Sequence, residues 1–242
     1  MAAPRFYHPL PLESGAHVAL PEALAHHAIR VLRLADGADI VLFDGRGAQY
    51  PATLRIEGKK GYAFLGQAQA PATELAGRIT VLQGIASGDK MDWIIEKAVE
   101  IGVCHFVPVR ARRSVLQLNA ERQAKRLAHW QRVIESASEQ CGRNRLMTLS
   151  EPLTLADYFR QPRTGLHLFC DPDAPQTLAQ AISPDQQDIV ILIGPEGGWA
   201  DEEQEAALRA QAQAIRFGRR VLRTETAALA LGAAISALQG WE

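Results

Sequence analysis

The chain has 242 residues, 47% of them hydrophobic, and its 26 basic and 27 acidic side chains leave a formal net charge of −1. A chain of this length and apolar content can bury one substantial core, or a medium core with a small appended domain. We therefore expect one or two domains, and the near-neutral total excludes a protein that is basic over its whole length.

The sequence has no sign of secretion, membrane insertion or disulfide bonding. Met1–Leu10 lacks the charged and apolar regions of a secretory signal, and the longest Ala/Leu-rich run, Ala227–Leu238, is too short to span a bilayer. Cys104, Cys141 and Cys170 lack the paired spacing of a disulfide framework or a zinc site. We expect a cytoplasmic protein with no membrane segment and no metal.

Charge is distributed unevenly along the chain. Residues 1–77 have a net charge of 0, residues 78–145 of +5 and residues 146–242 of −6. The basic middle segment is a candidate phosphate-contacting surface, and its arginines and lysines include Arg110, Arg112, Arg113, Arg122, Lys125, Arg126, Arg132, Arg143 and Arg145. A solvated helix face explains the same pattern equally well.

The first part of the chain has the pattern of a small β domain. Short β-like runs occur at Val18–Leu20, Ile40–Phe43, Tyr50–Ile56 and Tyr62–Leu65. They are separated by turn-forming residues at Asp36-Gly37, Asp44-Gly45 and Gly58–Gly61. One helical stretch, Pro21–Leu34, interrupts the strands. These elements predict a small barrel with one helix, followed by a linker at Gln67–Gly77.

From Arg78 onward strands and helices alternate, which is the pattern of an α/β domain. The expected strands are Ile79–Ile85, Cys104–Val109, His167–Cys170 and Asp188–Ile193. The expected helices are Lys90–Ile101, Asn119–Cys141, Asp201–Ala212 and Thr224–Leu238.

The most distinctive local feature is an apolar strand that leads into the glycine-rich segment Gly194–Trp199 and then a helix. Ligands of open α/β sheets bind at such strand ends, and glycine lets the backbone approach a bound molecule closely. The segment is neither a P-loop nor a dinucleotide fingerprint. Asp201 and Gln204 have the spacing of a capping box for the helix that follows. A tight turn without a ligand is the alternative interpretation.

A second strand end leads through Phe217–Arg223 into the Ala-rich final helix, for which Thr224 is a plausible N-cap. Small residues from Ala227 to Ala234 predict that this helix packs unusually closely on neighbouring elements or on a partner subunit.

These motifs together resemble the RsmE family within the SPOUT superfamily of methyltransferases. The resemblance rests on Lys90–Val103 (KMDWIIEKAVEIGV), Arg113–Val115, Glu139–Arg143 (EQCGR), the two loops above, and His27 with Val31–Arg33 in the N-terminal region. It covers nearly the whole chain.

The resemblance implies an α/β fold: a trefoil-knotted methyltransferase domain at residues 71–242, preceded by a PUA-like, RNA-binding β-barrel at residues 1–70. General fold rules would disfavour such a knot, so it is expected from the resemblance alone. The implied activity is methylation of N3 of a uridine in small-subunit (16S) ribosomal RNA, with S-adenosylmethionine as cofactor and a homodimer as the assembly.

Site residues follow from the same resemblance. We predict cofactor contacts from Leu168, Gly194, Pro195, Glu196, Gly197, Gly198, Val221, Leu222, Arg223 and Thr226. We predict RNA contacts from Arg33, Lys90, Arg110, Arg113 and Arg143, and catalytic roles for Arg143, Glu139 and Glu196.

The chemistry restricts the catalytic residues further. Uridine N3 stays protonated at neutral pH, so a base must take the proton or positive charge must favour the anion. Candidate bases are Glu139, Glu196 and Glu225, each of which could instead be an ordinary surface carboxylate. His26 and His27 are adjacent rather than at metal-ligand spacing, which indicates structural or solvent-facing roles.

Arg143 is the predicted contact to the target nucleotide, because its planar donor fork matches a phosphate or a base edge. Two other interpretations stay open at the level of sequence. One is a methyltransferase of another RNA, acting at a ribose hydroxyl, and the other is a non-catalytic RNA-binding protein.

Overall fold

The computed structural model describes residues 3–114 and 120–241, and it divides into two compact units. The first comprises residues 1–74 and 138–146, and the second comprises residues 75–137 and 147–242. Val115 and Asn119, named above in a motif and at a helix start, lie outside the described residues.

The first unit is a five-stranded sheet of order β1-β3-β4-β5-β2. Its strands are β1 (Arg5–Tyr7), β2 (His17–Ala19), β3 (Asp39–Phe43), β4 (Gln49–Glu57) and β5 (Lys60–Leu65). Only β1 was not predicted; three residues are too few to display a period. The expected helix is shorter than predicted: α1 spans Glu22–His26 and continues as one π-helical turn, η1, at His27–Val31.

Alternating burial along β4 creates the core of this unit. Tyr50, Ala52 and Leu54 are buried, whereas the residues between them are more exposed. Ala25 of α1 packs in the same cluster. The segment 138–146 joins this unit through Arg5, whose guanidinium donates to Asn144 Oδ1 at 2.7 Å.

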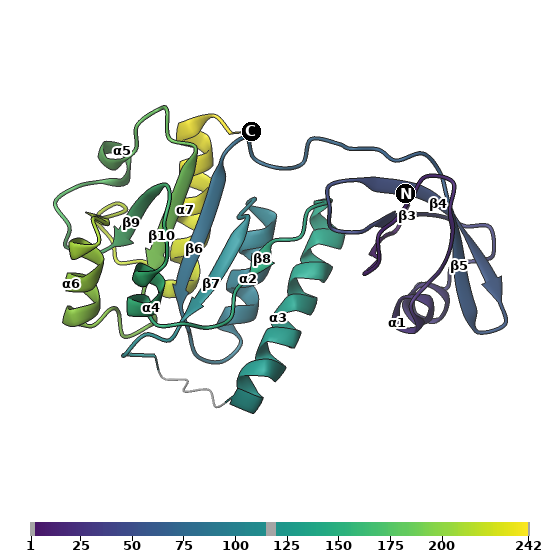
Figure 1. Cartoon of the computed structure of the whole chain (residues 1–242), viewed down its shortest axis with the longest axis horizontal. Coiled ribbons are helices and arrows are strands. Elements are labelled where there is room, and N and C mark those ends of the chain that lie inside the picture. Colours follow the sequence, from purple (N-terminus) through teal and green to yellow (C-terminus); the bar gives the residue numbers. More distant parts are fainter. Residues whose placement is uncertain (1–2, 115–119, 242) are drawn as a thin grey trace. The chain divides into compact units, whose positions relative to one another are not determined.

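The second unit is built on a six-stranded sheet of order β11-β9-β10-β6-β7-β8, in which every neighbouring pair is parallel. Its strands are β6 (Arg78–Gly84), β7 (His105–Val109), β8 (Thr148–Leu149), β9 (Leu166–Cys170), β10 (Asp188–Ile193) and β11 (Gln213–Ile215). The short strands β8 and β11 were not predicted, again because two or three residues show no period. In Figure 1 the strands β9, β10, β6, β7 and β8 lie side by side in this order, with helices next to them.

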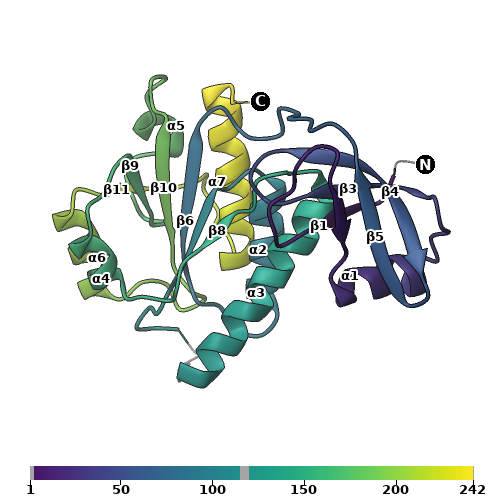
Figure 2. The ribbon, with the colours of Figure 1, turned by 45° about the vertical axis from the view of Figure 1, so that its right-hand side comes forward.

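Helices cover both faces of this sheet, which is why its central strands are apolar on both sides. The helices are α2 (Lys90–Glu100), α3 (Ala120–Cys141), α4 (Leu155–Arg160), α5 (Leu178–Ala181), α6 (Asp201–Arg209) and α7 (Thr224–Gln239). Leu82, Val190 and Leu192 pack with Leu155 of α4 and Ala207 of α6. Helix α7 lies along β6 and β10 and against α2, as Figures 1 and 2 both show.

The small residues of α7 are used within the unit. A Cβ on Gly232 would come within 2.5 Å of Ile101 Cδ1, so a larger residue there would have to displace the end of the Ile101 side chain. The predicted close packing therefore has an intramolecular partner. Thr226, Ala233 and Ala237 of the same helix remain exposed.

Both predicted helix caps were wrong by one residue. Helix α6 has Ala200 at its N-cap, and Glu203 accepts the Ala200 amide at 2.9 Å. The capping pair is therefore Ala200 and Glu203, one residue before the predicted pair Asp201 and Gln204. Helix α7 has Arg223 at its N-cap, because the Thr224 hydroxyl is engaged with a neighbouring loop.

Among the described residues, no helix is both long and apolar enough to cross a bilayer.

Candidate functional site

A pocket of about 620 Å³ lies in the second unit at the carboxyl ends of β9, β10 and β11. The strand order reverses here, because β7 lies on one side of β6, whereas β10 and β9 lie on its other side. Such points are where open α/β sheets bind ligands. Two loops form most of the wall: residues 194–199 after β10, called the glycine loop below, and residues 216–223 after β11, called the arginine loop.

The glycine loop is held against β6 by a contact that only glycine allows. A Cβ on Gly84, at the end of β6, would meet Pro195 Cδ at 2.4 Å and Pro195 N at 2.5 Å. At the other end of the loop, Gly198 has a φ of +69°, and no described atom lies within 4 Å of its Cβ position. The loop backbone is thus fixed while its pocket side stays open.

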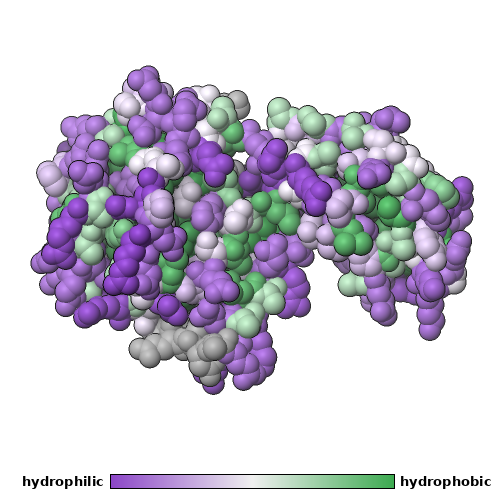
Figure 3. All heavy atoms as spheres, in the orientation of Figure 1, coloured by the Kyte–Doolittle hydropathy of each residue, from purple (hydrophilic) through white to green (hydrophobic). Residues whose placement is uncertain are grey.

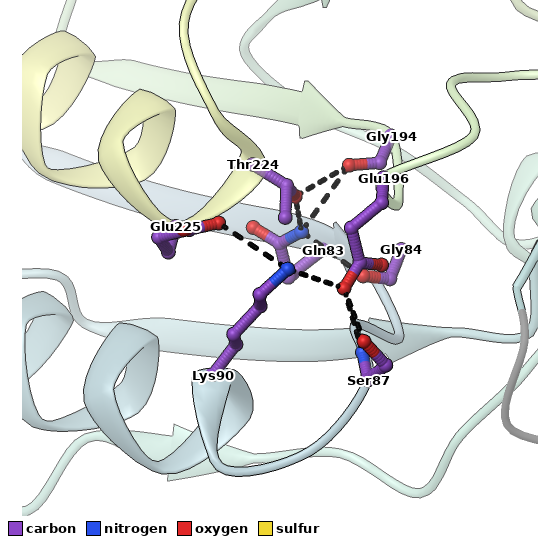
Figure 4. A network of polar contacts seen from close by, with 8 residues as sticks. All are labelled: Gln83, Gly84, Ser87, Lys90, Gly194, Glu196, Thr224 and Glu225. Carbon is purple, nitrogen blue, oxygen red and sulfur yellow. Dashed lines mark hydrogen bonds and ion pairs between the residues drawn. The ribbon is translucent and has the colours of Figure 1, made fainter.

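Glu196 anchors this loop to the segment before α2 (Figure 4). Its Oε1 accepts the Ser87 amide at 3.0 Å, the Ser87 hydroxyl at 2.6 Å and Lys90 Nζ at 2.8 Å. Partial burial alone would raise the pKa of this carboxyl, but the hydrogen bonds from Lys90 and Ser87 outweigh it and lower the pKa to about 2. Glu196 is therefore ionised and fully engaged at neutral pH.

A second set of contacts joins β6, the glycine loop and α7. Gln83 is fully buried, and its Nε2 donates to Thr224 Oγ1 at 2.8 Å. The Thr224 hydroxyl donates in turn to Gly194 O at 2.6 Å (Figure 4). The first turn of α7 is thereby tied to the glycine loop, which explains why Thr224 does not cap its own helix.

Two further carboxylates line the pocket, Glu225 and Asp171. Glu225 Oε2 is buried without a hydrogen-bond partner and lies 4.0 Å from Lys90 Nζ, so Lys90 stands between Glu196 and Glu225. Asp171 accepts from Gln204 at 3.1 Å. The rest of the wall is apolar and includes Phe169, Ile193, Trp199, Ile215, Leu222 and Leu231.

Seven of the ten predicted cofactor residues line this pocket: Gly194, Pro195, Glu196, Gly198, Val221, Leu222 and Arg223. The other three do not. Leu168 is buried in the middle of β9, between β10 and β11. Gly197 faces Arg113, and Thr226 is exposed on α7.

The predicted catalytic residues are divided between the units. Glu196 lies in the pocket, whereas Glu139 and Arg143 belong to the first unit. Glu139 accepts the Tyr7 amide at 2.8 Å. Arg143 is 3% exposed, and its guanidinium forms a 2.7 Å ion pair with Glu74. A contact from Arg143 to RNA would have to replace this pair.

The predicted RNA contacts also differ in environment. Lys90 lines the pocket. Arg33, which has a φ of +54°, and Arg110 are exposed. Arg113 lies 3.5 Å from Asp201 and donates to Gly197 O at 3.4 Å, so part of its donor capacity supports the glycine loop.

Several residues of the site were absent from the predicted set. Asp171, Arg216 and Arg220 line the pocket, and Gln83 and Ser87 contact its glycine loop. Asp171 could have been found, because it directly follows the predicted strand His167–Cys170, where ligands of parallel sheets bind. Gln83 and Ser87 had no such signal, since their roles depend on contacts with residues more than 100 positions away.

Comparison with known proteins identifies the family. Residues 73–236 match a model described as an RNA methyltransferase domain, and residues 20–64 match an RNA methyltransferase PUA domain. A ribosomal RNA small subunit methyltransferase E from Synechocystis sp. is 32% identical over 92% of this chain and 74% of its own length. The chain belongs to this methyltransferase E family. The predicted family, α/β fold and N-terminal PUA-like domain are confirmed.

Solved structures agree with this assignment. A ribosomal RNA small subunit methyltransferase E from Neisseria gonorrhoeae, bound to S-adenosyl methionine, superposes with a TM-score of 0.91 at 36% identity and covers 98% of both chains. A methyltransferase from Legionella pneumophila in complex with the same cofactor also has a TM-score of 0.91, at 30% identity, covering 99% of this chain and 98% of that one.

Proposed function

We propose that this protein transfers a methyl group from S-adenosylmethionine to N3 of a uridine in small-subunit ribosomal RNA. The observation that carries the proposal is the pocket at the switch point of the sheet, built from two backbone-rich loops in a chain of this family. Two relatives of known structure have S-adenosyl methionine bound. The activity implies a cytoplasmic protein, since that is where the RNA is made.

The pocket residues fit this cofactor. The apolar wall around Phe169 and Leu222 suits an adenine ring, and the open side of Gly198 lets a ligand approach the backbone. The carboxylate of Asp171 suits its cationic groups. When bound, the cofactor supplies an electrophilic methyl group on a sulfonium, so the protein must position the acceptor and keep water out.

We infer that the residues around Lys90 remove the uridine N3 proton. Glu196 was predicted to be catalytic, but a carboxylate with a pKa of about 2 and three donors is a weak base. Glu225 has a carboxylate oxygen without a hydrogen-bond partner in the pocket wall. We assign Glu225 the proton at N3, Lys90 the stabilisation of the developing anion, and Glu196 the positioning of Lys90.

The predicted roles of Glu139 and Arg143 stay part of the proposal. Their contacts with Tyr7 and Glu74 support a structural contribution to the first unit, to which a contact with RNA would be added. Deleting the barrel at residues 1–70 would test its RNA binding poorly, because it would also remove Arg5, the partner of Asn144. Substitution of exposed Arg33 is the better test.

The homodimer and the trefoil knot also remain proposals. The exposed small residues of α7, including Thr226 and Ala233, support a close subunit contact there. Light scattering at micromolar concentration tests the dimer; a stable monomer with full activity would contradict it.

Mass mapping of modified nucleosides tests the activity directly. Small-subunit RNA from cells lacking the protein should lose one base-methylated uridine, and expression of the wild-type chain should restore it. Expression of the Glu225→Gln variant should not restore it, whereas the Glu205→Gln variant, altered on the outer face of α6, should.

The other outcomes separate the alternatives. Loss of a ribose methyl group instead would indicate a methyltransferase with a different RNA target. An unchanged modification map, together with no binding of S-adenosylmethionine by the folded protein in calorimetry, would favour a non-catalytic RNA-binding protein.

A further inference from the structure

The arginine loop concentrates positive charge in the most acidic part of the chain. Residues 146–242 have a net charge of −6, yet four of their seven basic residues lie within residues 216–223. No acidic residue occurs between Glu205 and Glu225. The net negative charge of residues 146–242 therefore includes a local cluster of positive charge.

Three of these four arginines have no partner within the described part of the chain. Arg216 donates to the carbonyl oxygens of Ala174 and Pro175 and so holds the loop in place. The side chains of Arg219, Arg220 and Arg223 are exposed, and none of them forms an ion pair or a hydrogen bond with a described residue. Arg220 and Arg223 line the pocket, whereas Arg219 does not.

Three members of the basic middle segment, which is predicted to contact phosphate, do have acidic partners. Arg112 lies 3.4 Å from Glu202 and Arg113 lies 3.5 Å from Asp201, both on α6. Lys125 pairs with Glu121 at 2.7 Å. These acidic partners reduce the local positive potential, so the arginine loop is the less neutralised cationic surface next to the pocket. Figure 3 shows that the surface over α6 is largely hydrophilic.

The arginine loop also exposes apolar side chains. Phe217 is 37% exposed and Val221 is 77% exposed. Cations interleaved with exposed aromatic and aliphatic groups match an unpaired nucleic-acid strand, which offers phosphates and apolar base faces together. A small anion would need the cations alone.

We propose that Arg219 and Arg220 bind RNA phosphates beside the target nucleotide, so that the loop that forms one wall of the methyl-donor pocket also holds the substrate strand. The inference rests on the proposed function, because it takes RNA as the substrate. Arg223 remains the predicted cofactor contact. The position of Arg219 outside the pocket wall distinguishes a phosphate contact from a bond to the cofactor carboxylate.

The test compares an Arg219→Ala/Arg220→Ala double variant with the wild-type protein. Its probe is small-subunit ribosomal RNA from cells lacking the protein. Affinity for this RNA should fall by about tenfold or more, and the slope of log affinity against log salt should decrease by about 0.7 for each lost contact. Affinity for S-adenosylmethionine, measured by calorimetry, should fall much less than affinity for RNA, although Arg220 lines the pocket.

Two matched variants isolate the cause. Arg209→Ala removes an exposed, ion-paired arginine of α6 and should leave RNA affinity unchanged. The Arg219→Lys/Arg220→Lys variant keeps the charge and should retain most of the salt slope.

Unchanged RNA affinity in the alanine double variant would overturn the inference. So would a loss of cofactor affinity with normal RNA binding, since the arginines would then serve the cofactor carboxylate. Failure of the proposed function is distinguishable: the wild-type protein would leave the RNA unmethylated, while the salt dependence of binding would still report on the two arginines.

Discussion

The two loops of the pocket wall differ in how they are held. In the glycine loop, Glu196 accepts three hydrogen bonds and Gly194 O accepts the Thr224 hydroxyl. In the arginine loop, Arg216 is held by two carbonyl oxygens, and the next arginines, Arg219 and Arg220, extend into solvent.

This difference indicates a division of labour. Groups that are bonded before a ligand arrives lose little conformational entropy on binding, which suits a loop that must present a fixed backbone to a cofactor. Long exposed side chains adapt to a flexible polymer and neutralise its phosphates. The glycine loop therefore fits a preorganised cofactor contact, and the arginine loop a substrate contact.

The most severe test of the anchored loop is Gly84→Ala. The new Cβ would lie 2.4 Å from Pro195 Cδ, so the loop must move. We expect a loss of about 3 kcal/mol in the free energy of unfolding, together with weakened cofactor binding. Gly88→Ala is the control: its φ of +62° adds a backbone strain that Gly84 does not have, but its Cβ position is open space, so the change should cost only about 1 kcal/mol. Urea denaturation measures both, and equal losses would contradict the close approach.

Glu196→Gln removes the anchor without adding bulk. The pKa of Glu196 is depressed from 4.5 to about 2, so its contribution is complete above pH 4.5 and is lost as the pH falls toward 2. Solvent around this exposed carboxylate reduces the effect, so we expect about 2 kcal/mol of destabilisation at pH 7, and a difference from wild type that shrinks as the pH falls from about 5 to 2. Urea denaturation at several pH values measures this. A difference independent of pH would show that the carboxylate charge is not what anchors the loop.

Gly198→Val tests whether the open side of the glycine loop faces the cofactor. Among the described residues, no atom lies within 4 Å of the new Cβ, but φ is +69° and the side chain would enter the pocket. Affinity for S-adenosylmethionine should fall at least tenfold, about 1.4 kcal/mol, while the fold survives. Gly58→Val, at φ +63° in the hairpin between β4 and β5, is the matched control for backbone strain. If Gly198→Val bound the cofactor normally, the pocket assignment would be wrong.

The smallest effect on stability is expected in the arginine loop. Arg219→Ala and Arg220→Ala remove side chains that have no partner among the described residues, so each should change the free energy of unfolding by less than about 0.5 kcal/mol. Thermal melting of the two variants measures this. A loss above 1 kcal/mol would mean that the loop is as firmly built as its neighbour.

Much of the fold could be predicted from the sequence, because long elements repeat their pattern. The alternation along β4, the apolar run of β10 and the helical period of α2 each extend over several residues, and all were predicted. The strands β1, β8 and β11 have two or three residues each, and they exist because their neighbours offer hydrogen bonds.

The candidate site shows the same difference between local features, which could be predicted, and long-range contacts, which could not. The sequence by itself determined that a glycine-rich segment follows the apolar strand at residues 188–193 and that a second turn precedes the final helix, because strand ends and turn residues are local features. Only the tertiary structure decided which charges are free. Arg143 is buried against Glu74, whereas Arg219 and Arg220 face solvent. The pKa of Glu196 is low because Ser87 and Lys90, which follow a different strand, donate hydrogen bonds to its carboxylate. Burial and pairing depend on residues far away in the chain, so no local pattern encodes them.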